Sequence, residues 1–238
     1  MKGLILAGGK GTRLQPATFT INKHMVPILN RPMILYPLET LKYAGITDIM
    51  IVTGGDHIGS IAEFLGDGSD YGVQLTYRVQ KEAGGIAQAL SLAKDFVGSD
   101  SVAVILGDNI FDYTAFPATL PPSVGSTDAM LFLSLVPDAS RFGVPELKDG
   151  KIVGIEEKPK EPKSNYAVTG FYIYPPNVFD IIPTLKPSAR GELELTDVNN
   201  WYVTNGRCAH HIHTGFWSDA GTRNSLKEVI DWAHARES

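Results

Sequence analysis

The most informative segment of the chain is Lys2–Leu14, which has the sequence KGLILAGGKGTRL. Its first part, Lys2–Leu6, is a compact apolar run and predicts a short buried strand. Gly8 and Gly9 follow directly, and a glycine cluster after such a run indicates a tight turn. The segment therefore predicts a strand that ends in a turn, and the chain that follows shows which kind of sheet this strand joins.

Short apolar runs alternate with helical patterns through the first half of the chain. Further strands are expected at Asp48–Thr53, Gln74–Val79 and Val102–Leu106. Helices are expected between them, at Pro32–Ala44, Ile58–Leu65 and Ile86–Phe96. This alternation is typical of a parallel sheet covered by helices on both faces. The expected fold class is therefore α/β, with a Rossmann-like, mostly parallel sheet flanked by helices.

The pattern changes after Asp108 and becomes a mixed, β-rich half. Strands are expected at Met130–Val136, Ile152–Ile155, Val168–Tyr174 and Cys208–Ile212. Helices are expected at Val178–Ile182, Asp197–Val203 and Arg223–Ala235. We expect a single domain over residues 1–238, in which two halves, 1–109 and 110–238, share one sheet.

Composition excludes several classes of protein. With 43% hydrophobic and 20% charged residues among 238, the chain is that of a globular domain and not of a disordered one. Its 21 basic and 26 acidic side chains leave a net charge of −5, which excludes a general nucleic-acid-binding surface. The single cysteine, Cys208, excludes an internal disulfide framework.

The apolar segments are too short for targeting or membrane insertion. The run after Met1 is shorter than the core of a signal peptide. The longest strongly apolar stretch, Ala129–Val136, is far below the ~18 residues of a membrane helix. We therefore expect a soluble, cytoplasmic protein without a membrane partner.

The turn at Gly8, Gly9 and Gly11 can hold an anion. Successive glycines leave the backbone N–H groups accessible, and such groups form anion-binding nests. Arg13 adds positive charge, so a nucleoside triphosphate suits the turn. A dinucleotide fingerprint is disfavoured because Leu14 stands where its third glycine belongs, and a P-loop is disfavoured because no Gly-Lys-Ser/Thr ends the turn. A plain structural turn remains the alternative.

The motif Gly8–Leu14, followed by Lys23 and Pro27, resembles the signature of the sugar-1-phosphate nucleotidyltransferase family. Further segments narrow the resemblance to the thymidylyltransferase branch of that family: Gly84–Ala89, Gly107–Phe111, Glu156–Pro159, Arg190–Glu192 and Trp217–Thr222. The resemblance covers residues 3 to about 226. It is closest to the short form of this branch, for which a separate regulatory nucleotide site is not expected.

The resemblance implies a set of site residues. Those implied for catalysis are Arg13, Lys23, Asp108 and Lys158. Those implied for nucleotide binding are Leu6, Ala7, Gly8, Gly9, Gly11, Thr12, Arg13, Gln80, Gly85 and Asp108. Those implied for binding the sugar phosphate are Asn109, Gly143, Glu157, Lys158, Val168, Arg190 and Trp217. Residues 1–109 thus become the nucleotide-binding half and residues 110–238 the sugar-phosphate-binding half.

Two aspartates are candidate ligands for Mg²⁺. Asp108 follows a predicted strand, and Asp219 lies in a similar setting beside a glycine-containing turn. Magnesium prefers a few carboxylates together with phosphate oxygens and water. The resemblance implies that the pair binds Mg²⁺. For Asp219 the alternative is a cap for the helix expected at Arg223.

Gln80 and Gly85 are the candidates for reading the base. A glutamine side chain can both donate and accept, which matches the N3–H and carbonyl edge of thymine or uracil. Because both pyrimidines share that edge, a preference for thymine has to come from contacts with its methyl group and with the deoxyribose.

The histidines at 210, 211 and 213 look like a metal cluster at first sight. On a strand, however, His211 and His213 face one side and His210 faces the other. We therefore expect them to be solvated strand histidines.

The resemblance implies that the chain joins dTTP and α-D-glucose 1-phosphate to give dTDP-glucose and pyrophosphate, with Mg²⁺ as cofactor and as a homo-oligomer, a dimer or a tetramer. Three alternatives stay open. They are a related transferase that uses UTP or another sugar 1-phosphate, a dinucleotide-dependent oxidoreductase, and a non-catalytic nucleotide-binding subunit.

Overall fold

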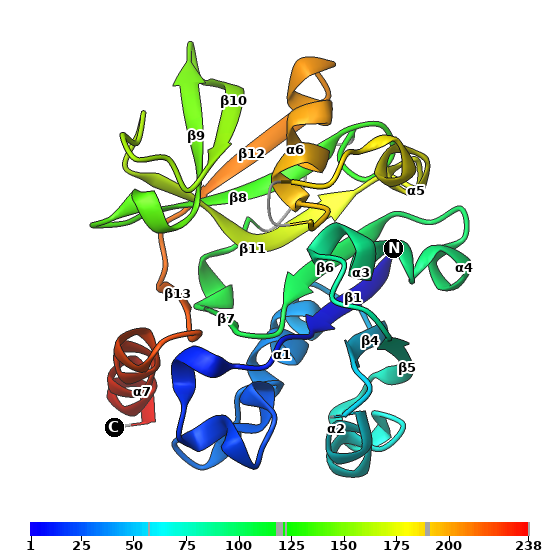
Figure 1. Cartoon of the computed structure of the whole chain (residues 1–238), viewed down its shortest axis with the longest axis vertical. Coiled ribbons are helices and arrows are strands. Elements are labelled where there is room, and N and C mark those ends of the chain that lie inside the picture. Colours follow the sequence, from blue (N-terminus) through cyan, green and yellow to red (C-terminus); the bar gives the residue numbers. More distant parts are fainter. Residues whose placement is uncertain (57, 118–120, 122, 189–190, 238) are drawn as a thin grey trace.

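A computed structural model of the chain describes residues 1–56, 58–117, 121, 123–188 and 191–237. Within these ranges the main sheet has seven strands in the order β12–β8–β11–β6–β1–β4–β5 (Figure 1). Their bounds are β1 Lys2–Ala7, β4 Asp48–Gly54, β5 Gln74–Gln80, β6 Val102–Leu106, β8 Ala129–Leu135, β11 Tyr166–Tyr174 and β12 Cys208–His213.

The sheet is mostly parallel, as expected for the α/β class. Strand β1 pairs in parallel with β4 and β6, and β4 pairs in parallel with β5. Strand β11 runs antiparallel to both of its neighbours, β6 and β8, while β12 is parallel to β8. Because β6 belongs to the first half of the sequence and β11 to the second, the two halves share one sheet.

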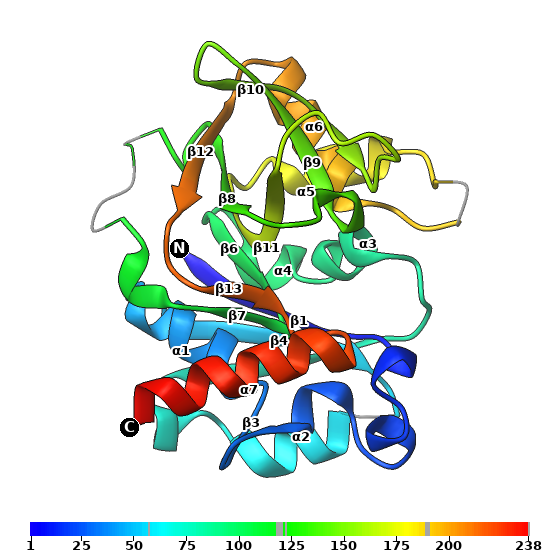
Figure 2. The ribbon, with the colours of Figure 1, turned by 90° about the vertical axis from the view of Figure 1, so that its left-hand side faces the viewer.

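Helices cover both faces of this sheet (Figures 1 and 2). They are α1 Leu35–Tyr43, α2 Ile58–Leu65, α3 Ile86–Ser91, α4 Lys94–Val97, α5 Val178–Ile181, α6 Leu195–Thr204 and α7 Arg223–Glu237. Short 3-10 helices lie at Thr12–Leu14, Ala17–Phe19, Lys23–Met25, Ser69–Tyr71, Tyr113–Ala115, Ala139–Arg141 and Ile182–Thr184.

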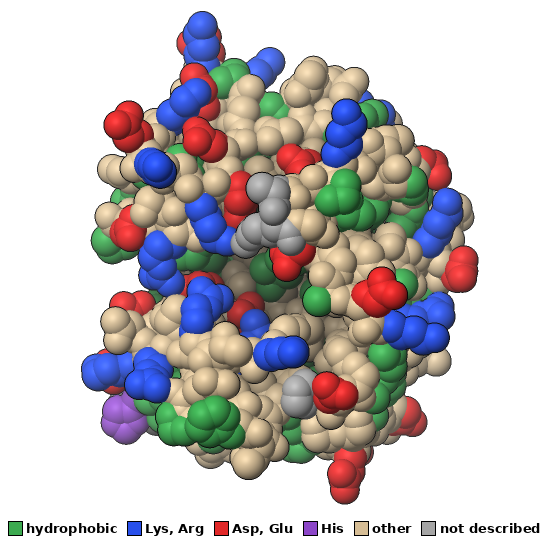
Figure 3. All heavy atoms as spheres, viewed as in Figure 1, with side chains coloured by type: hydrophobic (Ala, Val, Ile, Leu, Met, Phe, Trp, Pro, Cys, Tyr) green, Lys and Arg blue, Asp and Glu red, His purple; other side chains and the backbone are tan. Residues whose placement is uncertain are grey.

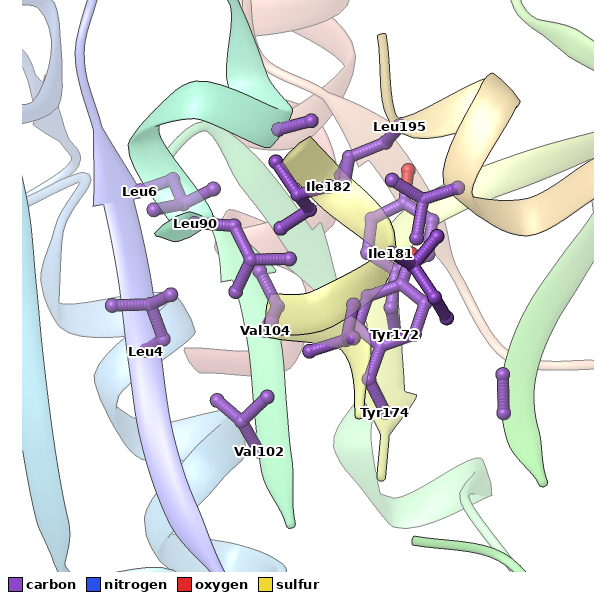
Figure 4. Close-up of a cluster of buried hydrophobic side chains, with 14 of the residues drawn as sticks. Leu4, Leu6, Leu90, Val102, Val104, Tyr172, Tyr174, Ile181, Ile182 and Leu195 are labelled. Atoms are coloured by element: carbon purple, nitrogen blue, oxygen red, sulfur yellow. The ribbon is translucent and has the colours of Figure 1, made fainter. Parts of the chain in front are cut away.

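Strand β1 shows how the two faces are filled. Side chains of a strand alternate between faces, so Leu4 and Leu6 enter one buried cluster while Ile5 and Ala7 enter another. The first cluster continues through β6, β11 and α5, where Val104, Tyr174 and others pack (Figure 4). A strand buried on both faces reads as a continuous apolar run, which is why this one was predictable from the sequence.

Three pairs of strands lie outside the main sheet. Strand β9 (Gly143–Lys148) pairs with β10 (Lys151–Glu157), and β2 (Pro27–Ile28) pairs with β3 (Arg31–Pro32). Strand β7 (Asn109–Phe111) pairs antiparallel with β13 (Trp217–Asp219), and Figure 2 shows α7 running beside this pair. The sequence did not predict β7, β9 or β13. Strands of three residues are too short for periodicity, and β9 carries Pro145.

Two predicted helices differ from the observed ones by more than two residues at one end or by a break. The helix expected at Pro32 begins at Leu35, because Arg31–Pro32 pair with β2 and the Met33 N–H donates to the Val26 carbonyl over 3.0 Å. The helix expected over Ile86–Phe96 is divided into α3 and α4. At the division the Ala93 N–H bonds three residues back, to Leu90 O at 3.0 Å. In the part of the chain that the structure describes, no helix has the length and apolar character needed to span a membrane.

Candidate active site

A cavity of about 390 Å³ opens at the carboxyl ends of β1 and β6, between the two halves of the chain. Parallel α/β sheets hold their ligands at this edge. Figure 3 shows the hollow on the surface, with Lys and Arg side chains along its rim. The first half contributes the glycine turn and the end of β6 to its wall, and the second half contributes β9, β11 and β13.

The glycine turn is packed directly against Lys23. Gly9 and Gly11 have φ angles of +97° and +62°, which glycine adopts readily. A Cβ atom on Gly11 would lie 2.9 Å from Lys23 Cβ and 3.0 Å from Thr18 Cγ2, so a side chain has no room there. Asn22 caps the short helix Lys23–Met25 by accepting a 2.8 Å hydrogen bond from the His24 N–H. The turn and the cap together fix the position of the Lys23 backbone and Cβ atom.

Asp108 follows β6 and is paired with Lys23. Lys23 Nζ lies 2.6 Å from Asp108 Oδ2, and Asn109 Nδ2 donates to Asp108 Oδ1 over 3.1 Å. Burial acts to raise the pKa of Asp108, but the positive charges of Lys23 and His24 and these hydrogen bonds outweigh burial and hold the pKa well below its usual range. Asp108 is therefore ionised at neutral pH although it is only 9% exposed.

Asp219 reaches the same volume through the β7–β13 pair. In that pair Asp219 lies opposite Asn109, and the Ala220 N–H donates to Asp108 O over 2.7 Å. A Cβ atom on Gly221 would lie 3.3 Å from Asp108 Oδ2 and 3.8 Å from Asp219 Oδ2. The two carboxylates therefore converge on one point.

The closeness of the two carboxylates affects the pKa of Asp219. Burial and the negative charge of Asp108 raise the pKa of Asp219 to about 6, although Arg141, Arg13 and Lys23 oppose the rise. The alternative of a helix cap is wrong, because the Ser225 N–H of the following helix donates to Thr222 Oγ1 over 3.2 Å.

Arginine side chains complete the charged part of the cavity. Arg13 Nη2 lies 3.3 Å from the same hypothetical Gly221 Cβ, and Arg141 Nη2 lies 3.4 Å from Asp219 Oδ1. Lys158 stands further along the wall, where its Nζ is 3.2 Å from Glu157 Oε1. Its backbone is in the left-handed region, with a φ of +49°, and its N–H donates to Phe142 O over 2.9 Å.

The opposite end of the cavity contains Gln80 and Gly85. Gly85 has a φ of +96°, and a Cβ atom there would lie 2.5 Å from the Leu193 carbonyl oxygen, so the position requires glycine. Gln80 Nε2 donates to Gly85 O over 3.2 Å and to Gln88 Oε1 over 2.6 Å. This end holds an amide side chain whose hydrogen bonds fix its direction.

Glu157 of the second half and Asn109, the last residue of the first half, are also held in place. Glu157 Oε2 accepts a 2.6 Å hydrogen bond from Thr196 Oγ1. Asn109 Oδ1 accepts from the Gly170 N–H over 2.9 Å and from Trp217 Nε1 over 2.8 Å. A Cβ atom on Gly170 would lie 2.5 Å from Asn109 Oδ1, so this contact also requires glycine.

Most of the predicted site residues line this one cavity. They are Leu6, Gly8, Gly9, Arg13, Lys23, Gln80, Gly85, Asp108, Asn109, Gly143, Glu157, Lys158, Val168, Trp217 and Asp219. Ala7, Gly11 and Thr12 lie at the end of β1, in the turn and at the start of the following 3-10 helix and do not line the cavity wall, and their contact with a nucleotide stays a prediction. Arg190 lies outside the described residues.

The sequence reasoning missed several lining residues, among them Arg141, Phe142, Tyr172 and Thr196. Arg141 was findable, because it stands two residues before the predicted Gly143 and carries a charge suited to phosphate. Thr196 was not, because nothing in the sequence links it to Glu157.

The two carboxylates fit a hard cation that takes its remaining ligands from a substrate. Such sites need only one or two protein carboxylates when phosphate oxygens and water complete the shell. Among the described residues there is no group of three or more His, Cys, Asp or Glu side chains placed to hold a metal. The raised pKa of Asp219 reflects the burial of its carboxylate and the negative charge of Asp108, and a bound cation would offset both.

The expectation for the histidines is wrong at His213. This side chain is only 3% exposed, and its ring packs at 5.4 Å from that of Phe111 and at 4.9 Å from that of Phe116. Burial lowers the pKa of His213. The strand periodicity was correct, but the face that it assigned to His213 is covered by aromatic side chains.

Comparison with known proteins agrees with this geometry. The nucleotidyl transferase family matches residues 2–235. The chain belongs to this family. Two proteins with similar sequences are the glucose-1-phosphate thymidylyltransferases of Neisseria meningitidis and Mycolicibacterium smegmatis. The first is 45% identical over 98% of this chain and 82% of its own length, and the second is 43% identical over 100% and 83%.

Solved structures of this nucleotidyl transferase family share the whole fold. A crystal structure from Bacillus anthracis, assigned to the glucose-1-phosphate thymidylyltransferases and containing sucrose, has a TM-score of 0.89 and is 50% identical over 98% of this chain and 95% of its own. A UDP-glucose pyrophosphorylase in complex with UDP-glucose has a TM-score of 0.84 at 27% identity, over 99% of this chain and 98% of its own. The chain thus combines a family-wide fold with closer similarity to the thymidylyltransferases.

Proposed function

We propose that this nucleotidyl transferase transfers the thymidylyl group of dTTP to α-D-glucose 1-phosphate and releases dTDP-glucose and pyrophosphate. The observation that carries the proposal is the meeting of Asp108, Asp219, Arg13 and Lys23 beside the glycine turn, in a cavity that also extends to Gln80. Similarity to enzymes named glucose-1-phosphate thymidylyltransferase supports the choice of substrates.

The chemistry of the substrates defines what the chain has to do. The second pKa of a phosphate monoester lies near ~6, so the attacking sugar-phosphate oxygen is already ionised and needs no general base. That oxygen attacks the α-phosphorus of dTTP, forming a new P–O bond. The bond to the β-phosphate breaks, and pyrophosphate leaves with the electron pair. The protein therefore has to bring two polyanions together and hold them in line.

Arg13 and Lys23 are the proposed counter-charges for the triphosphate. Both line the cavity next to Gly8 and Gly9, whose backbone suits an anion. Lys158 is the proposed partner of the sugar phosphate, with Glu157 next to it for the sugar hydroxyls. Loss of one such charged contact is expected to cost about 3 kcal/mol of barrier, or ~10²-fold in rate.

Asp108 and Asp219 are the proposed ligands of Mg²⁺. When bound there, Mg²⁺ neutralises phosphate charge and stabilises the charge that builds up on the leaving pyrophosphate. The two aspartates contribute to this site by supplying ionised carboxylates. Asp108 is kept ionised by Lys23, and Asp219 loses its proton above about pH 6.

Pyrophosphate release tests the function. The panel pairs dTTP or UTP with α-D-glucose 1-phosphate or another sugar 1-phosphate, each with Mg²⁺ or with EDTA. We expect the fastest release with dTTP and glucose 1-phosphate, and none with EDTA. Faster release with UTP would assign the chain to UDP-sugar synthesis, and binding of dTTP without any release would leave a non-catalytic nucleotide-binding subunit.

Two further expectations accompany the proposed function. The homo-oligomer, a dimer or a tetramer, stays a prediction that light scattering of the purified chain tests. The functional division into a nucleotide-binding half, 1–109, and a sugar-phosphate-binding half, 110–238, is likewise a proposal. It is supported by the position of Gln80 in the first half and of Glu157 and Lys158 in the second.

A further inference from the structure

Gln80 reaches the cavity with its amide group oriented by two acceptors. Its Nε2 donates to Gln88 Oε1 over 2.6 Å and to the carbonyl oxygen of Gly85 over 3.2 Å. An amide nitrogen has two N–H donors, so both are used. The other end of the amide, Oε1, lies 3.3 Å from the place of a Cβ atom on Gly8, at the cavity wall. The group that Gln80 presents to the cavity is therefore an acceptor.

The reverse orientation is disfavoured by the neighbours. If the Gln80 amide turned over, its oxygen would face the Gly85 carbonyl oxygen, and two acceptors would oppose each other. Turning Gln88 as well would restore the bond between the two side chains, but the contact with Gly85 would still be repulsive. Because a backbone carbonyl can only accept, Gly85 sets the direction of the Gln80 amide, and the shorter bond that Gln80 donates to Gln88 holds the amide there.

Gln88 is itself confined by the segment that leads into α3. A Cβ atom on Gly84 would lie 2.9 Å from Gln88 Cγ and 3.3 Å from its Cδ, so the Gln88 side chain packs over a bare glycine. Gly84 is held in turn, because its carbonyl accepts from the Leu193 N–H over 3.0 Å. The segment Gly84–Gln88 thus forms a support for one side chain of the cavity.

We propose that Gln88 is a positioning residue that makes the nucleotide site selective for bases with an N3–H donor. The inference rests on the proposed function, in which Gln80 faces the base. Thymine and uracil carry a hydrogen at N3 and can donate to Gln80 Oε1. Cytosine has a lone pair at N3 and would face an acceptor with an acceptor, so dCTP is rejected.

Calorimetric binding of dTTP, dUTP and dCTP, with Mg²⁺ and without sugar phosphate, tests this role. The variants are Gln88→Leu and Gln88→Met, which lose the acceptor, and Gln88→Glu, which keeps it. Gln74→Leu, at the exposed start of β5, the strand that ends at Gln80, is the matched control. Two apolar variants are used so that the measurement can still be made if one of them does not fold.

We expect the wild-type chain to bind dTTP and dUTP about 100-fold more tightly than dCTP. In Gln88→Leu and Gln88→Met this ratio should fall below about tenfold, partly because dCTP binds better. Gln88→Glu and Gln74→Leu should keep the wild-type ratio.

Three results would overturn the role of Gln88. They are a wild-type chain that does not discriminate against dCTP, apolar variants with an unchanged ratio, and a Gln88→Glu variant that loses selectivity as the apolar ones do. An equal loss of affinity for all three nucleotides in the apolar variants leaves the ratio unchanged and counts against it too. Failure of the proposed function is seen separately, as a wild-type chain that prefers dTTP in binding but releases no pyrophosphate from dTTP and glucose 1-phosphate.

Discussion

The end of β6 and the end of β13 each deliver one aspartate to the cavity, and they do so in different ways. Strand β6 is a central strand of the main sheet. Asp108 follows β6 in the sequence, and its carboxylate is paired with Lys23 at 2.6 Å. Strand β13 has three residues and pairs only with β7 among the described strands, and the contact of Asp219 with Arg141 is longer, at 3.4 Å.

The difference appears in the two pKa values. Lys23 keeps the pKa of Asp108 below its usual range, whereas burial and the charge of Asp108 raise that of Asp219 to about 6. One carboxylate is thus kept ionised by its lysine partner, and the other is brought close to neutrality in its titration by burial and by the first carboxylate. The comparison teaches that two carboxylates suited to one cation can differ in ionisation. One of them is always ionised near neutral pH, and the other has a pKa of about 6.

Asp108→Asn is expected to have the largest effect. It removes the carboxylate that the protein keeps ionised, so the turnover rate should fall by at least about 10³-fold while the chain stays folded. Pyrophosphate release at saturating Mg²⁺ measures the rate, and circular dichroism checks the fold. Near-normal turnover in this variant would refute the metal assignment.

Arg13→Ala comes next and should lower kcat by ~10²-fold, because Arg13 faces the point where Asp108 and Asp219 meet. Steady-state kinetics with varied glucose 1-phosphate separate kcat from KM. Lys10→Ala, an exposed cation of the same turn, serves as the control. An increase only in the KM for glucose 1-phosphate would move Arg13 to the sugar side of the cavity.

Asp219→Asn should stabilise the chain in EDTA at pH 8. The raised pKa means that the folded state holds this proton more tightly than the unfolded state, so Asp219 lowers stability as the pH rises from about 4 past about 6. Removing the charge should therefore raise the free energy of unfolding by about 1–3 kcal/mol at pH 8, and by less at pH 5. Denaturant unfolding of both chains at the two pH values measures the gain.

Asp108→Asn should act in the opposite direction in the same experiment, because it leaves Lys23 without its buried partner. A loss of stability in both variants would show that the charge of Asp219 is compensated as well as that of Asp108. The proposed difference between the two aspartates would then be wrong.

Thr196→Val is expected to have the smallest effect of the series. The change keeps the shape but removes the hydrogen bond to Glu157, so the KM for glucose 1-phosphate should rise about fivefold at an unchanged kcat. Thr196→Ser keeps the hydroxyl and should restore the wild-type value. If the valine variant matched wild type, Glu157 would not depend on Thr196 for its position.

The central strands and Asp108 were predictable from the sequence, because strands buried on both faces read as short apolar runs and Asp108 directly follows one. Asp219 was paired with Asp108 only through family resemblance. The reason is physical: β7 and β13 are too short for periodicity, and the register that places Asp219 opposite Asn109 joins segments that are distant in the sequence.

The supports of the site side chains were not predictable at all. The contacts of Gln88 with Gln80 and of Thr196 with Glu157 depend on tertiary packing between elements whose sequence gives no sign of it. His213 was misjudged for a related reason, since the periodicity of a strand does not show what covers each face.

A Mg²⁺ titration of pyrophosphate release from dTTP and α-D-glucose 1-phosphate, run in parallel on wild type, Asp108→Asn and Asp219→Asn, tests whether the two aspartates serve one cation. We predict that wild type is inactive without Mg²⁺ and saturates as it is added, that Asp219→Asn needs a higher concentration, and that Asp108→Asn stays inactive throughout. A wild-type Mg²⁺ curve in either variant would contradict a shared site.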